Sequence, residues 1–147
     1  ARGVVAADKV SAAFIQTWVR QNPDAGRELL WMNESYVFFR ELADLAADDG
    51  PIGAMKRSVT AGRSIAVDPD HVPLGAPVWI EKDAPDPMVR LMVAQDTGSA
   101  IKGAQRADIF FGTGAVAGAI AGGVKHNGRM IVLLPVAVAD RLVAGVT

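Results

Sequence analysis

Short runs of hydrophobic residues, separated by turns rich in glycine and proline, recur along most of the chain. Such runs are typical of β-strands when they contain β-branched and aromatic residues and last only about four to eight positions. We expect strands at residues 36–40, 64–68, 77–81, 88–95, 108–111 and 129–134. Short strands at regular spacing with few helices favour a small closed barrel that carries short helices on its outside.

The first part of the chain has a helical pattern instead. Apolar residues recur at intervals of three and four between Asp8, which can cap a helix, and Pro23, which disfavours a helical residue before it. Residues 24–30 predict a second, shorter helical piece. We expect Trp18 and Trp31 to pack in the core, because buried aromatic side chains contribute most to small cores.

These patterns predict three parts of the chain. Residues 1–35 form a helical lead-in segment, residues 36–135 form the barrel, and residues 136–147 form a C-terminal tail. Half of the 147 residues are hydrophobic, which is enough for one domain with a real core.

The composition argues against several classes of function. A net charge of −1 gives no electrostatic reason to expect nucleic acid or an anionic membrane as a partner. Cysteine is absent, and neither His71 nor His126 has a second histidine at ligand spacing, so we expect no metal and no other cofactor. The apolar run at residues 130–139 contains Pro135 and is too short to span a bilayer.

Residues 91–114 hold the candidate chemistry. An apolar run leads to Asp96 in a turn, a loop of small residues follows, and Asp108 opens a second apolar run. Two carboxylates beside apolar walls are one way to raise the pKa of one acid and leave the other ionised. The stretch is therefore candidate acid–base apparatus, provided that the fold brings the two strands together.

The same stretch resembles a known family. The sequences DTGSAIKG at 96–103 and ADIFFGTG at 107–114 are similar to the core of the membrane-bound lytic murein transglycosylase A family and of related 3D (three-aspartate) domains. Further motifs follow in the family's order at 36–40, 50–53, 62–68, 73–77 and 125–129. Several motifs in one order are far more specific than any single motif.

The resemblance implies a mainly β fold, a six-stranded double-psi β-barrel with short peripheral helices. In that family the barrel is discontinuous and is built from segments on either side of an inserted second domain. We therefore expect this chain to be the C-terminal catalytic portion, with a barrel that can be incomplete. The upstream strands and the inserted domain, which form the other wall of the groove, are expected to lie outside these residues.

The resemblance also implies the chemistry, that of a lytic transglycosylase. Such an enzyme cleaves the MurNAc-β-1,4-GlcNAc bond of peptidoglycan and forms 1,6-anhydromuramoyl ends. On the family motif Asp108 is the general acid and then the base, which calls for apolar groups or another carboxylate around it, and Asp96 and Asp68 tune or orient it. The residues expected to contact the glycan are Gly98, Ser99, Ala100 and Lys102. Ser99 stands where the family usually has a second glycine.

The expected partners are peptidoglycan glycan strands and the N-terminal portion of the same protein, without nucleic acid. The chain begins with alanine, so we expect a cut or processed segment. Family membership would place the protein in the cell envelope, on the periplasmic side of the outer membrane, with a lipid anchor upstream of this segment.

Two alternatives stay open at this point. One is a non-catalytic barrel that binds peptidoglycan or another glycan, since half of a groove can bind without cleaving. The other is an aspartic peptidase, because Asp96-Thr97-Gly98-Ser99 is also the tetrapeptide of that class, whose paired carboxylates share a proton. Gln95 argues against the peptidase, because an apolar residue is expected before that aspartate.

Overall fold

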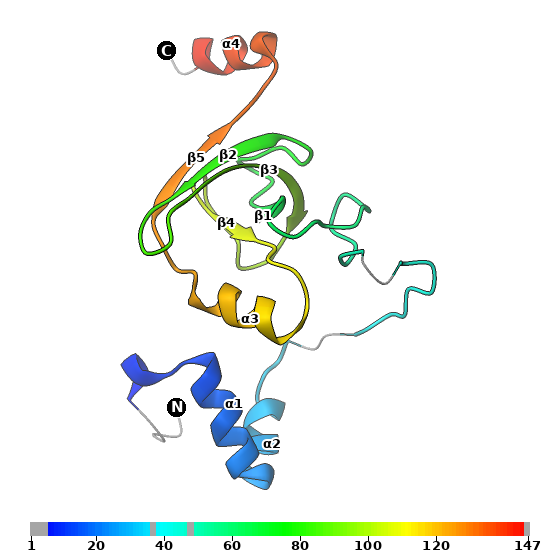
Figure 1. The fold of residues 1–147 in the computed structure, drawn as a ribbon, viewed down its shortest axis with the longest axis vertical. Coiled ribbons are helices and arrows are strands. Elements are labelled where there is room, and N and C mark those ends of the chain that lie inside the picture. Colours follow the sequence, from blue (N-terminus) through cyan, green and yellow to red (C-terminus); the bar gives the residue numbers. More distant parts are fainter. Residues whose placement is uncertain (1–5, 36–37, 47–48, 146–147) are drawn as a thin grey trace. The chain divides into compact units, whose positions relative to one another are not determined.

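The computed structural model describes residues 6–35, 38–46 and 49–145. The chain divides into two compact units, Ala1–Asp44 and Leu45–Thr147. The described residues of the first unit form helices, and those of the second form a β-sheet with short helices (Figure 1).

The N-terminal unit contains the 3-10 helix η1 (Ala7–Lys9) and the helices α1 (Ala12–Gln21) and α2 (Pro23–Trp31). Ser11 caps α1, because its Oγ accepts a hydrogen bond of 3.1 Å from the N–H of Phe14, which the first helical turn leaves free. The expected cap at Asp8 is wrong, since that residue lies within η1. Pro23 stands at the first position of α2, where a proline is well tolerated.

The two helices pack closely around a glycine. A Cβ on Gly26 would lie 2.9 Å from the Cα of Val19, so a larger residue would push α2 away from α1. Trp18 is only partly buried, and Trp31 is 76% exposed. The prediction that Trp31 packs in the core is therefore wrong for this unit.

The strand expected at residues 36–40 is not found in its described part. Tyr36 and Val37 lie outside the described residues, and residues 38–40 have no regular secondary structure. Aromatic and β-branched residues form strands where neighbouring strands supply partners and burial, and composition alone does not supply either.

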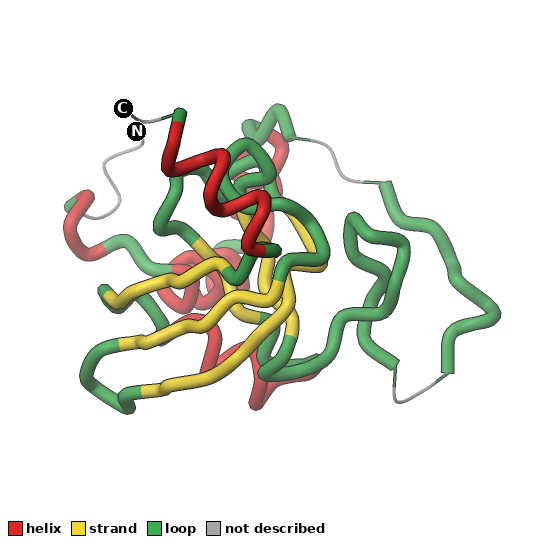
Figure 2. The backbone as a smooth tube through the Cα atoms, turned by 90° about the horizontal axis from the view of Figure 1, so that it is seen from above, coloured by secondary structure: helices red, strands yellow, loops and turns green. Residues whose placement is uncertain are grey.

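Five strands form one mixed sheet in the second unit: β1 (Ser64–Val67), β2 (Pro77–Lys82), β3 (Met88–Thr97), β4 (Ala107–Ile109) and β5 (Gly128–Val132). Their order is β4-β1-β3-β2-β5. Strands β1 and β3 run parallel, and the other pairs are antiparallel. Figures 1 and 2 show that the sheet curls strongly. The strands predicted after residue 60 and the mainly β fold with few short helices are thus confirmed.

The concave face of the sheet carries the hydrophobic core. Side chains alternate between the two faces of a strand, so one set is buried while the other faces outward. The buried set consists of Ile65, Val67, Val72, Ala76, Val78, Ile80, Met92 and Ala94. Strand β4, which pairs with β1 at the edge of the sheet, adds Ala107 and Ile109 to this core.

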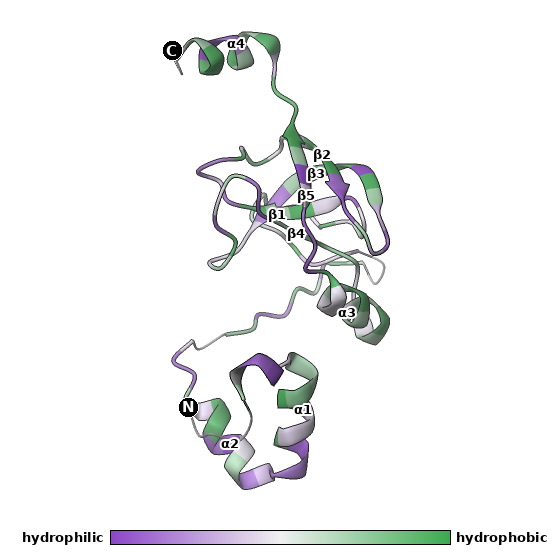
Figure 3. Cartoon of the chain, turned by 90° about the vertical axis from the view of Figure 1, so that its left-hand side faces the viewer, coloured by the Kyte–Doolittle hydropathy of each residue, from purple (hydrophilic) through white to green (hydrophobic). Residues whose placement is uncertain are grey.

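Two helices follow the edge strands, α3 (Gly114–Gly123) after β4 and α4 (Val136–Ala144) after β5. Helix α3 contains only glycine, alanine, valine and isoleucine, and Figure 3 shows it without a strongly hydrophilic residue.

The two faces of β3 predict different costs for truncating a side chain. Met92 is 1% exposed in the core, whereas Leu91 faces outward and is 42% exposed. Met92→Ala should lower the free energy of unfolding by about 2–5 kcal/mol, because it leaves a cavity among packed neighbours. Leu91→Ala should change it by no more than about 1 kcal/mol. Urea unfolding of the two variants tests this; equal losses would contradict the assignment of the two faces.

Candidate functional site

Two of the aspartates lie in one row across β4, β1 and β3. The register pairs Ala66 of β1 with Asp96 of β3 on one side and with Asp108 of β4 on the other. Paired residues on neighbouring strands project from the same face, and neighbouring strands lie about 4.8 Å apart. The Cα atoms of Asp96 and Asp108 are therefore about 10 Å apart, with only the methyl group of Ala66 between them.

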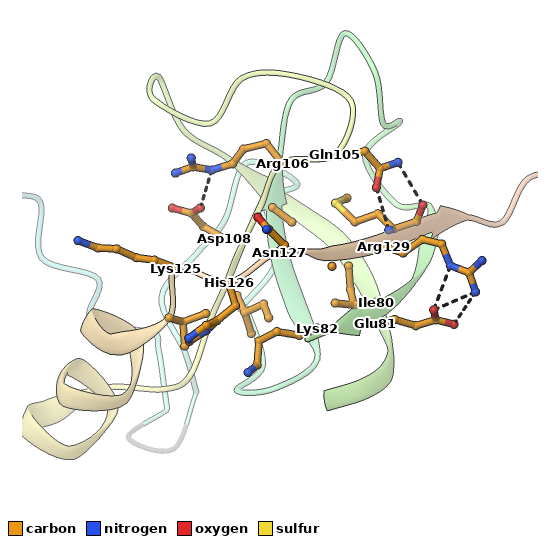
Figure 4. A pocket seen from close by; sticks show the side chains of 15 residues that line it. Ile80, Glu81, Lys82, Gln105, Arg106, Asp108, Lys125, His126, Asn127 and Arg129 are labelled. Atoms are coloured by element: carbon orange, nitrogen blue, oxygen red, sulfur yellow. Dashed lines mark hydrogen bonds and ion pairs between the residues drawn. The ribbon is translucent and has the colours of Figure 1, made fainter. Parts of the chain in front are cut away.

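Asp108 projects from the face opposite the core. Its neighbours Ala107 and Ile109 pack against the core, while the side chain of Asp108 is 56% exposed. Arg106 Nε donates a hydrogen bond of 3.2 Å to Asp108 Oδ1 (Figure 4). The apolar run that follows Asp108 thus does not enclose its carboxyl group, because alternate residues of a strand point in opposite directions.

Asp96 is half-buried and fastens a loop to β3. Its Oδ1 accepts a hydrogen bond of 2.9 Å from the N–H of Ala54, and the N–H of Met55 donates to the carbonyl of Gln95 at 3.2 Å. A Cβ on Gly53 would lie 2.7 Å from that carbonyl oxygen, so only glycine lets the loop come this close. Asp96 therefore holds residues 53–55 beside the row of aspartates.

Gln95 has a structural partner that explains its polar side chain. The buried Ser64 donates its hydroxyl hydrogen to Gln95 Oε1 and accepts a hydrogen bond of 2.8 Å from the N–H of Thr60. A buried hydroxyl needs such partners. The polar residue before Asp96 thus belongs to a hydrogen-bond chain between β3 and the start of β1.

Asp68 is buried at the end of β1, where it is 3% exposed. Its carboxylate accepts hydrogen bonds from the N–H of Gly103 at 2.9 Å and of Asp70 at 3.3 Å, and Lys102 Nζ lies 3.3 Å away. The N–H of Gly103 is the main cause that lowers the pKa of Asp68 below its ordinary value; burial opposes this, and Asp70 and Lys102 add to it. The carboxylate thus fastens the loop after β3 to the end of β1.

The expected glycan-binding residues lie on this fastened loop. Gly98 is partly buried, and a Cβ there would lie 2.9 Å from the buried side chain of Ile101. Ser99 and Ala100 are exposed, and Lys102 is exposed but paired with Asp68. Their assignment as glycan-binding residues stays a prediction.

A pocket of about 720 Å³ opens beside Asp108 (Figure 4). It is lined by residues 80–82 of β2, residues 105–109 around β4, and residues 124–130 at the start of β5 and before it. Of the three aspartates only Asp108 lines it, and residues 98–102 do not. No hydrogen bond joins two of these aspartates within the described part of the chain. The structure therefore brings Asp96 and Asp108 into one row and places Asp68 in a different set of contacts.

Paired polar groups hold the far end of the pocket. Arg129 donates to both oxygens of Glu81 at 3.0 and 3.1 Å, and Trp79 Nε1 donates to the same carboxylate at 3.0 Å. The Arg129 guanidinium is the main cause that lowers the pKa of Glu81 below its ordinary value. These bonds tie β2 to β5. In the same way, the N–H of Met130 in β5 donates a hydrogen bond of 2.9 Å to Oε1 of Gln105, which lies just before β4.

Sequence reasoning missed Lys82 and Gln105 as pocket residues. For Lys125 and Arg129, near His126, it left two interpretations open, residues that line the groove or residues of a solvated turn. The motif at 125–129 was the available signal for the last three. Lys82 and Gln105 reach the pocket through strand pairing, which no local pattern encodes.

Among the residues that the structure describes, no three histidine, cysteine or acidic side chains are grouped so that they could hold a metal ion. Nor does that part of the chain contain a helix of the length and apolarity needed to cross a membrane.

Comparisons with known proteins bear on the family of the chain. The model of the 3D domain matches residues 63–134, and that of the MltA-specific insert domain matches residues 1–40. A part of the inserted domain therefore lies in this chain, and the expectation that the whole of it lies outside is wrong. The 3D match also contains the Asp96–Ser99 tetrapeptide, which removes the basis for an aspartic peptidase.

Relatives of known identity cover most of the chain. It is 35% identical to membrane-bound lytic murein transglycosylase A of Vibrio cholerae, over 88% of this chain and 36% of that protein. The structure of a membrane-bound lytic murein transglycosylase from Agrobacterium tumefaciens is similar with a TM-score of 0.78 and 40% identity, over 95% of this chain and 39% of that one. The structure of E. coli MltA with bound chitohexaose is similar with a TM-score of 0.71 and 34% identity, over 80% of this chain and 37% of that one. The chain thus spans little more than a third of such relatives.

Asp68 predicts a dependence of stability on pH. A carboxylate whose pKa is lower in the folded state stabilises that state above its unfolded pKa of about 3.9, and the contribution is lost as the pH falls through the folded pKa. Asp68→Asn should lower the midpoint of thermal unfolding by several degrees at neutral pH. The difference in this midpoint between the variant and the parent protein should shrink below about pH 4. Asp70→Asn, an exposed change in the same turn, is the control. A difference that is constant across this range would contradict the role of the charge.

Proposed function

The chain belongs to the membrane-bound lytic murein transglycosylase A family, and on that premise we propose that it carries the catalytic aspartate of such an enzyme. The reaction is cleavage of the MurNAc-β-1,4-GlcNAc bond of peptidoglycan with formation of 1,6-anhydromuramoyl ends. The observation that carries the proposal is the position of Asp108, the one aspartate of the three whose side chain lines a pocket of saccharide size.

A single carboxyl group suffices for this reaction. Protonated Asp108 donates its proton to the glycosidic oxygen, and GlcNAc leaves. The carboxylate then takes the proton from the 6-hydroxyl of the muramoyl residue, whose oxygen attacks C1 and closes the anhydro ring. Atoms balance without water, so no second carboxylate is needed to activate a water molecule, unlike in hydrolytic glycosidases.

Arg106 must release Asp108 before this acid can act, because the hydrogen bond from arginine stabilises the ionised form of the carboxyl group and not the protonated form. Both side chains of the pair are more than half exposed. Exposed ion pairs contribute about 0–1 kcal/mol, so a glycan that enters the pocket can displace the arginine.

Asp96 and Asp68 act as positioning residues in this proposal. Asp96 holds the loop at residues 53–55 beside Ala66, and Asp68 holds the loop at residues 98–103. Gly98, Ser99, Ala100 and Lys102 on that second loop contact the glycan beyond the cleavage point. The reaction requires neither a metal nor a cofactor.

The fold is completed from outside these residues. Strands β4 and β5 are edges of the described sheet, and the chain covers about a third of its relatives' length. We infer that residues 36–135 are the catalytic part of a six-stranded double-psi β-barrel, flanked by the lead-in 1–35 and the tail 136–147. The rest of the family's length supplies the missing strands and the other wall of the groove. Membership also favours the periplasmic side of the outer membrane, with a lipid anchor upstream.

A non-catalytic glycan-binding barrel is the second candidate. The specific observation in its favour is the Arg106–Asp108 ion pair, since a carboxylate held by arginine has no proton to donate. Cleavage of purified peptidoglycan separates the two candidates.

Asp108→Asn should abolish the release of anhydromuramoyl products, with a loss of about 10²–10⁴-fold for a general acid–base group. Asparagine has the size of aspartate, so folding should be unchanged. In the assay, purified peptidoglycan is digested with a protein that contains this chain together with the remaining segments of a family member, and the products are resolved by mass spectrometry. Asp140→Asn, an exposed change in α4, is the matched control.

The other outcomes have distinct meanings. Full activity in Asp108→Asn would contradict the assignment of the acid. Products with reducing ends would indicate hydrolysis, with Asp96 as the first candidate for a second catalytic carboxylate. Binding without cleavage by the parent protein would favour the glycan-binding barrel.

A further inference from the structure

The pocket beside Asp108 carries more positive than negative side chains. Its basic lining residues are Lys82, Arg106, Lys125 and Arg129, and its acidic ones are Glu81 and Asp108. Each of the two acids is paired with an arginine of the same pocket. Lys82 and Lys125 thus have no carboxylate partner within the described part of the chain.

The two lysines differ in how they are held. Lys82 Nζ donates to the carbonyls of Asp83 at 3.3 Å and Pro85 at 2.8 Å, which fix the ammonium group but do not neutralise its charge. Lys125 is exposed in the turn between α3 and β5 and bonds to no residue that the structure describes. One fixed and one adaptable positive charge therefore belong to the lining of the same pocket.

His126, next to Lys125, is incompletely bonded. Its Nδ1 is a buried side-chain atom with no hydrogen-bond partner among the described residues. Buried polar atoms normally have partners, and one without a partner destabilises the structure until it finds one. Figure 4 shows Lys82, Lys125 and His126 on the side of the pocket toward α3, away from the Arg129–Glu81 pair. We call these three residues the basic end of the pocket.

We propose that the basic end binds a carboxylate of the glycan substrate and so selects murein over uncharged glycans. This inference rests on the proposed function and adds a specificity determinant to it. The muramoyl sugar differs from GlcNAc by a lactyl group, whose carboxyl is either free or joined to a stem peptide that has carboxylates of its own. Chitohexaose has no carboxylate. Two unpaired ammonium groups therefore recognise a feature that separates the two kinds of glycan.

The test measures dissociation constants on protein with Asp108→Asn, so that ligands stay intact. The ligands are chitohexaose, a murein glycan freed of peptide, and the same glycan with stem peptides. Adding Lys125→Glu should raise the dissociation constant for a carboxylate-bearing glycan by about fivefold or more, the upper range for an exposed ion pair, and leave that for chitohexaose unchanged. The parent's preference for the charged glycan should also weaken at high ionic strength. Arg141→Gln, a charge change in α4, is the control.

The two murein ligands identify the source of the carboxylate. A Lys125→Glu effect on the peptide-free glycan assigns the lactyl carboxylate, and an effect restricted to the glycan with peptides assigns the stem peptide. Equal losses for all three ligands, or no loss for any, would overturn the inference. The release of anhydromuramoyl ends is measured separately, on protein with Asp108 intact. No release would contradict the proposed function. Release together with equal binding of charged and uncharged glycans would contradict this inference alone.

Discussion

The register of β1 between β3 and β4 is the constraint on which the site depends. Ile65 and Val67 must face the core, because they fill its centre. Ala66 must then face the other way, and pairing places Asp96 and Asp108 on that same face. A shift of one residue in either pairing would turn an aspartate into the core and an apolar residue out of it. The packing of the core therefore fixes where the carboxyl group of Asp108 stands.

The three aspartates of the motif have different physical environments, although they are alike in sequence. Asp68 is buried and fully engaged by backbone N–H groups and a lysine, so its charge stabilises a loop. Asp96 holds a second loop through one N–H. Among the described residues, the side chain of Asp108 has one partner, a solvent-exposed arginine, beside an open pocket. A carboxyl group that the fold does not need for its own hydrogen bonds is free to exchange a proton with a substrate.

Much of the sheet was predictable from local patterns. The alternating apolar residues of β1, β2 and β3 indicate both strands and their buried faces, and the motif around Asp108 makes that residue the candidate acid. The strand at 36–40 and the burial of Trp31 were not predictable, because both depend on partners that a local window does not contain. The pocket could not be derived either: Lys82, Gln105 and Lys125 come from three segments that only strand pairing brings together. The cap at Ser11 was missed because η1 takes up Asp8.

The central claim is that one carboxyl group transfers a proton within the substrate and that water takes no part. Digestion of peptidoglycan in water labelled with oxygen-18 tests it most directly. The account predicts anhydromuramoyl ends that contain none of the label, because the 6-hydroxyl oxygen of the substrate itself forms the new bond. New reducing ends in place of anhydromuramoyl ends would contradict it, since the hydroxyl group at C1 of a reducing end is supplied by water.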